Sequence, residues 1–407
     1  IYIIINNTSG EINMGNKKQQ SQMEMKIENR RAVMEQVKDE EYVSRASLAR
    51  ELRMSPTSMS RICGDLMELG LIHEIQKAES AGVGRKAVWL KKNPDAFYSL
   101  GILIRQDFIG CIIADYGEKM IFQKKWEEEV PQNSRRLIET VAQHIKEVET
   151  QQPAFFKKVE AVGISFPGII DVKTGMIRYS DLFGWENTAF AVPLSEMIGI
   201  PCYMARDIKA SVIEEYHCGG RKEKSIGFLS LSQEVGAAWI QDGNIINGAD
   251  GICGEIGHKT VMFHGRKCTC GKQGCAAAYL TEASILKQAE ESGHFCASLF
   301  QLAQAYERKE SWAETLLQKT AEIAALLVED MIVWNNPEKI VLGGRTVRLF
   351  PELLDLVQEE VAKSNAGFPA ATRIEGSINP GNESMMGAAY IAMDENEKVK
   401  INSLKEM

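Results

Sequence analysis

A compact run of metal-binding residue types constrains this chain more than any other feature. His258 is followed, after nine intervening residues, by C-T-C-G-K-Q-G-C, which places thiols at Cys268, Cys270 and Cys275. One imidazole and three thiolates complete the tetrahedral ligand set of Zn²⁺, and sulfur ligands favour zinc over Mg²⁺ or Ca²⁺. Because four protein ligands leave no position for water, we predict a structural zinc site rather than a catalytic one. The alternative is a group of free core cysteines beside an unrelated histidine.

The composition is that of a globular protein from a reducing compartment. The 407 residues include nine cysteines, an odd number, which together with the clustered thiols favours metal binding over a disulfide framework. The apolar run Ile1–Ile5 is far shorter than the roughly 18–20 residues that cross a bilayer, and it has no basic segment before it. We therefore exclude membrane, secreted and fibrous classes. We expect a cytoplasmic protein with no membrane partner and two to four domains, at about 100–200 residues per domain.

The segment that follows residue 23 has the pattern of a small helical domain. Residues 1–23 are polar and show no sustained hydrophobic period, so we expect a disordered or artificially added tail, in which Met14 suits a translation start. A first amphipathic helix is predicted from Glu24 onward. Ser44 suits the N-cap of a second helix, and Ser55, which a proline follows, suits the N-cap of a third.

Two short strands around a Gly-rich turn follow the third helix. They are predicted at Leu71–Ile75 and Ala87–Leu90, and three helices followed by such a β-wing form a winged helix-turn-helix, which we place at residues 24–92. The third helix is expected to read the major groove, and the basic wing to reach a minor groove or a phosphate. The predicted DNA-binding residues are Thr57, Ser58, Ser60 and Arg61 in the helix, and Arg85 and Lys86 in the wing.

Charge is distributed unevenly along the chain. Residues 24–92 contain 13 Lys and Arg against 11 Asp and Glu, a net charge of +2. Residues 93–407 contain 32 against 43, a net charge of −11. A basic front on an acidic body is typical of a module that meets a polyanion such as double-stranded DNA. A winged helix that docks another protein has the same helical spacing, and this alternative stays open.

Residues 93–407 alternate short β-branched runs with longer helical stretches. Examples are the runs at 101–113 and 159–165 and the helix expected at 316–333. The alternation indicates an α/β fold. About 300 residues exceed what one compact core usually holds, so we expect two lobes.

The residues E-I-G-H at 255–258, followed by the cysteine run, resemble the signature of the ROK family of bacterial repressors, open reading frames and sugar kinases. Val162–Asp171, Ile340–Gly344 and Gly387–Ala389 match as well, so the resemblance extends over nearly all of residues 27–393. It implies an actin-like, two-lobed sugar-kinase fold with a sugar cleft between the lobes, preceded by the DNA-binding half of the family's repressors. It also implies zinc on the histidine and the three clustered cysteines. The positions that it implies for effector contact are Gly168, Asp181, Arg206, Asp207, Glu255 and His258.

The residues with which ROK kinases hold the phosphates of ATP are missing. The family's Asp-x-Gly-x-Thr loop aligns with Leu103–Asp107, in which Arg105 and Asp107 replace the glycine and the threonine. The second phosphate loop, Gly-Thr-Gly in the kinases, reads Ser232-Gln233-Glu234. A carboxylate repels a phosphate, and an arginine blocks the close approach of backbone N–H groups. We therefore predict that the chain is not an ATP-dependent enzyme.

The sugar-binding positions have changed as well. The family's Asn-Asp-x-Asn motif reads Arg206-Asp207-Ile208-Lys209, so the carboxylate of the general base persists beside two cations that favour its charged form. Glu255 persists, but the acid that the family has after the last zinc cysteine is Ala277. Because an unpaired buried polar group costs about 1–3 kcal/mol, the usual hexose is not expected to bind here. Either the effector differs, for example an anionic or phosphorylated sugar, or effector control has been lost.

These observations predict a DNA-binding transcriptional regulator, expected to be a repressor, of carbohydrate-related genes. A two-fold homodimer or homotetramer would place its recognition helices about one helical turn apart on a pseudo-palindromic operator. Three alternatives stay open, namely a ROK sugar kinase with an appended DNA-binding domain, a zinc sensor with an exchangeable site, and a docking module that binds no DNA.

Overall fold

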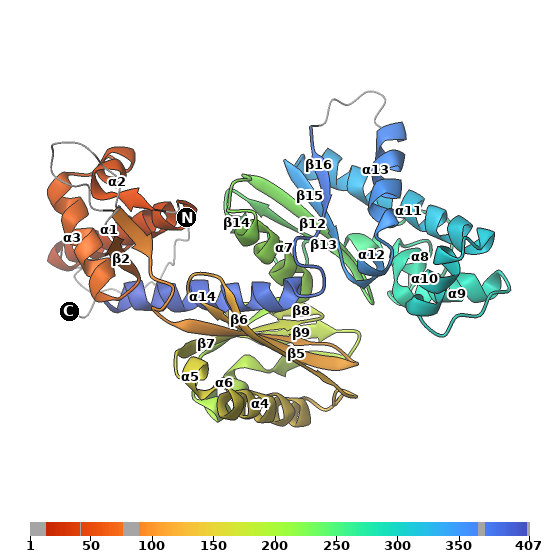
Figure 1. Cartoon of the computed structure of the whole chain (residues 1–407), viewed down its shortest axis with the longest axis horizontal. Coiled ribbons are helices and arrows are strands. Elements are labelled where there is room, and N and C mark those ends of the chain that lie inside the picture. The colour runs from red at the N-terminus through yellow and green to blue at the C-terminus, as the bar shows by residue number, and fades with distance from the viewer. Residues whose placement is uncertain (1–13, 41, 76–88, 365–370, 405–407) are drawn as a thin grey trace. The chain divides into compact units, whose positions relative to one another are not determined.

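A computed structural model of the chain describes residues 14–40, 42–75, 89–364 and 371–404, with side chains from residue 23 onward. The chain divides into two compact units (Figure 1). The first comprises residues 1–96 and 395–407, and the second comprises residues 97–394. The division differs from the predicted one, which assigned all of 93–407 to the kinase-like domain.

The N-terminal unit consists, in its described part, of helices and a small antiparallel sheet with the strand order β1-β3-β2. The end of the last helix of the chain joins them, because Glu397 forms an ion pair with Lys38 at 3.0 Å. This contact explains why residues 395–407 belong to the N-terminal unit. Its elements are α1 (Met14–Asp39), β1 (Val43–Ser44), α2 (Arg45–Glu51), α3 (Pro56–Glu68), β2 (Ile72–Ile75), β3 (Trp89–Lys92) and the last part of α14 (Glu383–Ser403).

Local hydrogen bonds begin α2 and α3 at the predicted residues. The Ser44 side chain accepts the backbone N–H of Ser47 at 3.0 Å, and the Ser55 side chain accepts that of Ser58 at 3.1 Å. Strand β2 begins one residue later than predicted, and two other boundaries differ more. Helix α1 begins at Met14, inside the segment expected to be a tail, and β3 runs two residues beyond the predicted strand. Residues 1–13 and 76–88, which include the predicted Gly-rich turn, lie outside the described residues.

The second unit has two lobes, each built on a five-stranded sheet. The first sheet has the order β11-β7-β4-β5-β6, in which β11, β7 and β4 are parallel and β5 and β6 are antiparallel to their neighbours. The run predicted at 101–113 is a hairpin, because the chain turns between β4 and β5. The elements of this lobe are β4 (Tyr98–Ile104), β5 (Phe108–Asp115), β6 (Met120–Glu127), α4 (Ser134–Gln151), α5 (Pro153–Phe156), β7 (Val159–Phe166), β8 (Ile169–Asp171), β9 (Met176–Ser180), β10 (Trp185–Ala189), α6 (Ala191–Ile198) and β11 (Cys202–Arg206).

The first half of α14 covers one face of this sheet, and α4 covers the other (Figure 1). Glycines permit the close approach of α14. A Cβ at Gly163 of β7 would lie 1.8 Å from the carbonyl oxygen of Ala388, and one at Gly387 would lie 1.7 Å from that of Ala210. Two segments that carry the family resemblance, at 162–171 and 387–389, thus pack against each other.

The second lobe is built on the sheet β14-β13-β12-β15-β16. Helix α7 packs on β12 and β13, and α11 packs along α13 (Figure 1). None of the described helices has an apolar stretch long enough to span a bilayer. The elements are α7 (Asp207–Cys218), β12 (Ser225–Leu231), β13 (Val235–Gln241), β14 (Asn244–Ile245), the 3₁₀ helix η1 (Ile256–His258), α8 (Ala277–Leu280), α9 (Glu282–Glu291), α10 (Leu299–Glu307), α11 (Ser311–Asn335), β15 (Lys339–Gly343), α12 (Arg345–Leu349), α13 (Glu352–Ser364) and β16 (Arg373–Gly376).

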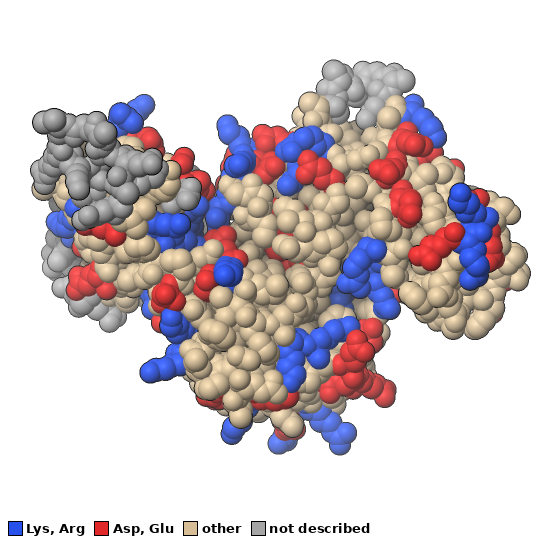
Figure 2. Space-filling view, in the orientation of Figure 1, with Lys and Arg blue, Asp and Glu red and all other residues tan. Residues whose placement is uncertain are grey.

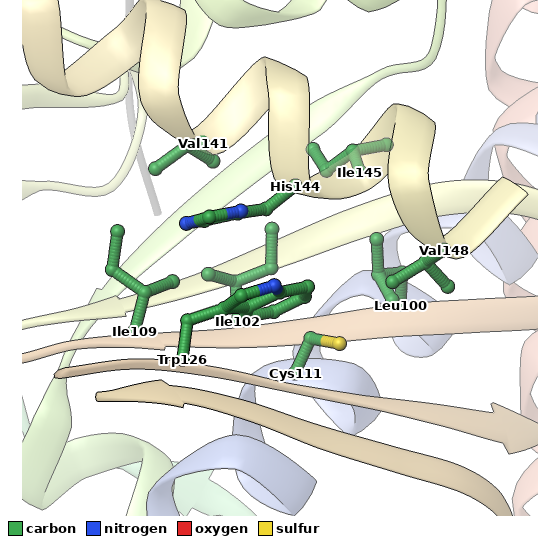
Figure 3. Close-up of a pocket in the computed structure, with 9 residues that line it drawn as sticks. All are labelled: Leu100, Ile102, Ile109, Cys111, Trp126, Val141, His144, Ile145 and Val148. Atoms are coloured by element: carbon green, nitrogen blue, oxygen red, sulfur yellow. The ribbon is translucent and has the colours of Figure 1, made fainter. Parts of the chain in front are cut away.

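A small void lies between α4 and the first sheet (Figure 3). Apolar side chains line most of it, and Trp126 stacks on His144 with 4.1 Å between the ring centroids. Its volume of about 10 Å³ corresponds to one water molecule at most. The void therefore belongs to the core of the lobe and offers no ligand site.

Candidate functional site

The four predicted metal ligands lie together in the second lobe. His258 ends the 3₁₀ helix η1, and Cys275 directly precedes the turn into α8. Between them the chain has only two isolated bridges, Thr260 with Cys275 and Lys267 with Gln273. The ligand atoms of His258, Cys268, Cys270 and Cys275 all lie within 4.8 Å of one another, and this is the only such group among the described residues.

The distances fit a tetrahedral zinc ion. The sulfurs of Cys270 and Cys275 are 3.6 Å apart, and the Cys268 sulfur is 3.6 Å from Nδ1 of His258. Two thiolates bound tetrahedrally to zinc at about 2.3 Å lie about 3.8 Å apart, close to the observed spacing. Gly274 has a positive φ of 76°, and a Cβ there would lie 1.6 Å from the carbonyl oxygen of Met262, so only glycine allows the turn between these ligands.

The carboxylate at the position of the kinase base is held in an ion pair. Asp207 begins α7 and is 3 % exposed, and its Oδ2 lies 2.8 Å from the guanidinium of Arg105. Arg105 stands in the turn between β4 and β5, where the kinases have the glycine of their phosphate loop. The sequence predicts that the cations beside this carboxylate are Arg206 and Lys209. The structure supplies a third, from a different element, because the β4–β5 turn lies beside the beginning of α7.

The two other cations of this motif have partners of their own. The guanidinium of Arg206, 5 % exposed, pairs with Glu255. The ammonium of Lys209, 4 % exposed, donates to Oδ1 of Asn247 at 2.7 Å and to the carbonyl oxygen of Gly251 at 2.9 Å. Burial lowers the pKa of Lys209, and the charge of Arg206 lowers it further.

Acidic groups occupy both phosphate-loop positions. Asp107, in the first, is 3.7 Å from the guanidinium of Arg345 at the start of α12. In the second, the hydroxyl of Ser232 donates to Glu282 at 3.1 Å. Burial raises the pKa of Glu234 to about 7, and the charge of Asp207 adds to the rise. The pocket at these positions is lined by the carboxyl groups of Asp107, Glu282 and Glu383 and by the guanidinium groups of Arg105, Arg345 and Arg348.

The side chains of the remaining predicted effector residues take no part in these ion pairs. Gly168, between β7 and β8, has a φ of 136°, and a Cβ there would lie 2.4 Å from the carbonyl oxygen of Tyr179. Asp181 is exposed after β9 and accepts a hydrogen bond from the Tyr179 hydroxyl at 3.3 Å. His258 directs Nδ1 toward Cys268, which places this imidazole in the metal cluster.

The predicted recognition helix presents its polar residues outward. In α3 the side chains of Met59, Ile62, Cys63 and Leu66 are buried. The predicted DNA-binding residues Thr57, Ser58, Ser60 and Arg61 are all exposed. Arg85 and Lys86 of the wing lie outside the described residues.

Sequence reasoning named Arg105 only as the loss of a glycine and did not place it in the site. It also missed Glu282, which the Ser232 hydroxyl contacts from α9. The sequence did contain a signal for Arg105. It is a cation in the phosphate-loop segment, and this segment meets the segment of the retained carboxylate, Asp207, in the sugar-kinase fold. Nothing in the sequence around Glu282 distinguishes it from other helix-start acids.

Known relatives align over most of the chain. The transcriptional repressor Mlc of Escherichia coli is 24% identical over 367 residues, which cover 86% of this chain and 89% of the repressor. The xylose repressor of Bacillus subtilis is 25% identical over 339 residues, covering 82% of this chain and 86% of that protein.

Solved structures show the same fold. A ROK family transcriptional regulator, described as a homolog of the Escherichia coli Mlc protein, superposes with a TM-score of 0.76 at 21% identity, covering 89% of this chain and 95% of that one. A ROK hexokinase from Thermus thermophilus superposes with a TM-score of 0.63 at 22% identity, covering 74% of this chain and 99% of the enzyme. The second unit therefore has the two-lobed, actin-like sugar-kinase fold. The profile of the ROK family matches residues 100–395, and the chain belongs to that family.

Proposed function

We propose that the chain is a DNA-binding transcriptional regulator, acting as a repressor, in which a former sugar-kinase unit senses a carbohydrate-related ligand. The ion pair between Arg105 and the buried carboxylate of Asp207 carries this proposal. A general base has to accept a proton from a sugar hydroxyl, and here its carboxylate is already neutralised by a residue of the lost phosphate loop. ATP-dependent phosphorylation is therefore not the function of this cleft.

The relatives support regulation rather than catalysis. Mlc is named a DNA-binding transcriptional repressor, and NagC of Escherichia coli, 24% identical over 332 residues, is named a transcriptional dual regulator. The hexokinase aligns with only 74% of this chain, whereas the ROK regulator aligns with 89%. The additional length in the regulator is consistent with a DNA-binding head in front of the kinase-like unit.

The N-terminal unit is proposed to bind double-stranded DNA through α3. Exposed Thr57, Ser58, Ser60 and Arg61 supply hydroxyls and one guanidinium for bases and phosphates. A two-fold homodimer or homotetramer would present two such helices, which requires a pseudo-palindromic operator. Arg85 and Lys86 of the wing are proposed to reach a neighbouring minor groove or phosphate.

A structural zinc ion is proposed for His258, Cys268, Cys270 and Cys275. When bound, it would crosslink a loop that has no helix or strand and is otherwise held by backbone hydrogen bonds such as that from Gly274 N–H to the carbonyl oxygen of Arg266. Glu255 precedes this loop directly and pairs with Arg206, so the metal set stabilises the position of one cleft carboxylate. A complete protein ligand set favours this structural role over a metal-sensing one.

An anionic carbohydrate derivative, such as a sugar phosphate, is the proposed effector. Lys209 is buried, and both oxygens that it contacts, on Asn247 and Gly251, are uncharged. An ammonium has three donors, and burial without an acidic partner is costly. A phosphate or carboxylate on the ligand would remove that cost.

The test of DNA binding uses the full-length chain and a pool of random-sequence duplexes. We expect retention that weakens steeply with salt, because phosphate contacts release counterions, and we expect enriched sequences to be pseudo-palindromic. Arg61→Ala should weaken binding, and Arg31→Ala, at an exposed arginine of α1, serves as the charge-matched control. Absence of salt-sensitive retention by the unaltered chain would refute the proposal.

A further inference from the structure

A groove lies between α1 and α3 of the N-terminal unit. It combines residues of the predicted recognition helix with residues of α1 that no sequence motif singles out. The residues that line it are Lys26, Asn29 and Arg30 from α1 and Thr57, Ser58, Arg61, Ile62 and Asp65 from α3. Ser60, although exposed on the same helix, does not line the groove.

The charges in this groove favour an anion. Its one acid, Asp65, is already neutralised, because Nε and Nη2 of Arg30 donate to the same carboxylate oxygen at 2.9 and 2.6 Å. The Arg30 side chain is 9% exposed and that of Asp65 23%, so solvent screens this pair only partly. Lys26 and Arg61 are both exposed, and among the described residues no acid forms an ion pair with either. The groove thus carries two positive charges that face solvent from two helices.

We propose that this groove holds the phosphate backbone of one DNA strand, with α1 as a second DNA-contacting element. This inference rests on the proposed DNA-binding function and extends it to residues outside α3. Lys26 and Arg61 contact phosphate from opposite walls, and the amide of Asn29 donates to a phosphate oxygen. Ser60, which is exposed but does not line the groove, is left to meet base edges. The contacts in the groove set position and affinity, whereas Ser60 contributes to sequence choice.

Arg30 acts as a positioning residue in this arrangement. Without its guanidinium, the Asp65 carboxylate would stand in the groove as a free negative charge and would repel a phosphate. The pair also ties α1 to α3 over 35 residues of sequence and sets the distance between the two walls. Arg30 itself is buried and is not proposed to touch DNA.

The test measures the salt dependence of binding to a mixed-sequence duplex by fluorescence anisotropy, with the full-length chain. Each lost phosphate contact lowers the slope of log K against log salt by about 0.9. The compared quantity is the factor by which affinity falls when the salt concentration rises from about 50 to about 200 mM. In Lys26→Ala this factor should therefore be roughly three times smaller than in the unaltered chain. The control is Arg31→Ala, which removes the same charge from the neighbouring turn of α1, outside the groove, and should leave the slope unchanged.

The outcomes separate this inference from the function on which it rests. If the unaltered chain shows no salt-dependent binding, the DNA-binding function itself fails. If the unaltered chain binds and Arg61→Ala weakens binding, but Lys26→Ala gives the same slope as Arg31→Ala, then α1 does not contact DNA and the groove proposal is overturned. Equal loss of slope in Lys26→Ala and Arg31→Ala would also overturn it, because the effect would then report overall charge.

A second pair of variants tests the positioning residue. Arg30→Met leaves the Asp65 carboxylate unpaired and should weaken DNA binding at low salt. Arg30→Met combined with Asp65→Leu removes both charges and should restore the affinity of the unaltered chain. Thermal unfolding confirms that each variant is folded. Failure of the double variant to recover binding, while it remains folded, would show that Arg30 does not act by neutralising Asp65.

Discussion

A single residue, Arg105, carries the proposed loss of catalysis in the kinase-like cleft. Arg105 stands at the position of a glycine in the kinases' phosphate loop. Its guanidinium forms an ion pair with the carboxylate of Asp207 at 2.8 Å. Asp207 is almost fully buried, so its charge needs a partner. In the proposed function, Arg105 therefore has two effects. It takes the place of a phosphate-binding glycine, and it gives the carboxylate at the position of the base a structural role in an ion pair.

Removal of Arg105 should destabilise the second unit. Arg105→Ala leaves Asp207 as an unpaired buried charge, with an expected cost of about 3 kcal/mol, near the low end for a broken buried pair because Arg105 is partly exposed. Arg105→Ala combined with Asp207→Asn should recover most of this loss. Urea unfolding measures both. Additive losses in the double variant would contradict a direct interaction between the two residues.

Two buried carboxyl groups on α7 should make stability depend on pH. Burial raises the pKa of Glu214 to about 8, helped by the charge of Glu215, and raises that of Glu215 to about 7, from an ordinary value of 4.5. Between the ordinary pKa and the raised ones, the folded chain holds protons that unfolding releases. The free energy of unfolding should therefore fall as the pH rises from about 5 to about 8. Thermal unfolding across this range should show the decrease, and Glu214→Gln should reduce it. An unchanged pH profile in Glu214→Gln would refute the assignment.

At the scale of elements, the loop between η1 and α8 contains the three cysteines of the proposed metal site and no helix or strand. The two isolated bridges named above are joined there by several backbone hydrogen bonds, such as that from Val261 N–H to the carbonyl oxygen of Gly274. Four ligands in one cluster would close this loop and keep Glu255 beside Arg206. The integrity of the cleft is thereby coupled to the metal set.

Replacement of one ligand should release the metal. The purified chain should contain about one zinc per molecule, and Cys275→Ser should contain much less. The loss of the crosslink should lower the melting temperature, by about 2–4 °C for each kcal/mol of stability lost in a unit of this size. Cys296→Ser, at a thiol outside the cluster, is the matched control. Far less than one zinc in the unaltered chain would refute the site.

At the scale of the whole molecule, the second unit keeps the two-lobed architecture of a kinase, with acidic residues at the positions of the kinases' phosphate loops. Gly163 and Gly387 allow α14 to pack directly against β7 and α7, so the helix is fixed in the second unit at its beginning. Its last residues belong to the N-terminal unit. One continuous helix therefore takes part in both compact units.

The kinase-like unit should bind a carbohydrate derivative without turning over ATP. A coupled assay with ATP, Mg²⁺ and common hexoses should detect no ADP formation. In a thermal-shift screen, a sugar phosphate at 100-fold its Kd should add about 2.7 kcal/mol of stability. Lys209→Met should abolish this shift and leave any shift by neutral sugars in place. ADP formation that depends on a hexose would contradict the proposed loss of catalysis.

The sequence by itself determined the features that depend on neighbouring residues. The caps at Ser44 and Ser55, the spacing of the four metal ligands and the alternation of strands and helices all act over a few residues, so a linear pattern reveals them. The family resemblance then supplied the two-lobed fold. The helix at 14–23 was missed because its polar residues carry no hydrophobic period.

Only the tertiary structure decided which distant groups meet. Arg105 pairs with Asp207 across about a hundred residues, the end of α14 joins the N-terminal unit, and Lys26 and Arg61 line one groove. Charge pairing of this kind depends on distance and burial in three dimensions, and residue types alone do not specify either one. For that reason the sequence predicted the loss of phosphate binding, whereas the structure identified the residue that neutralises the former base.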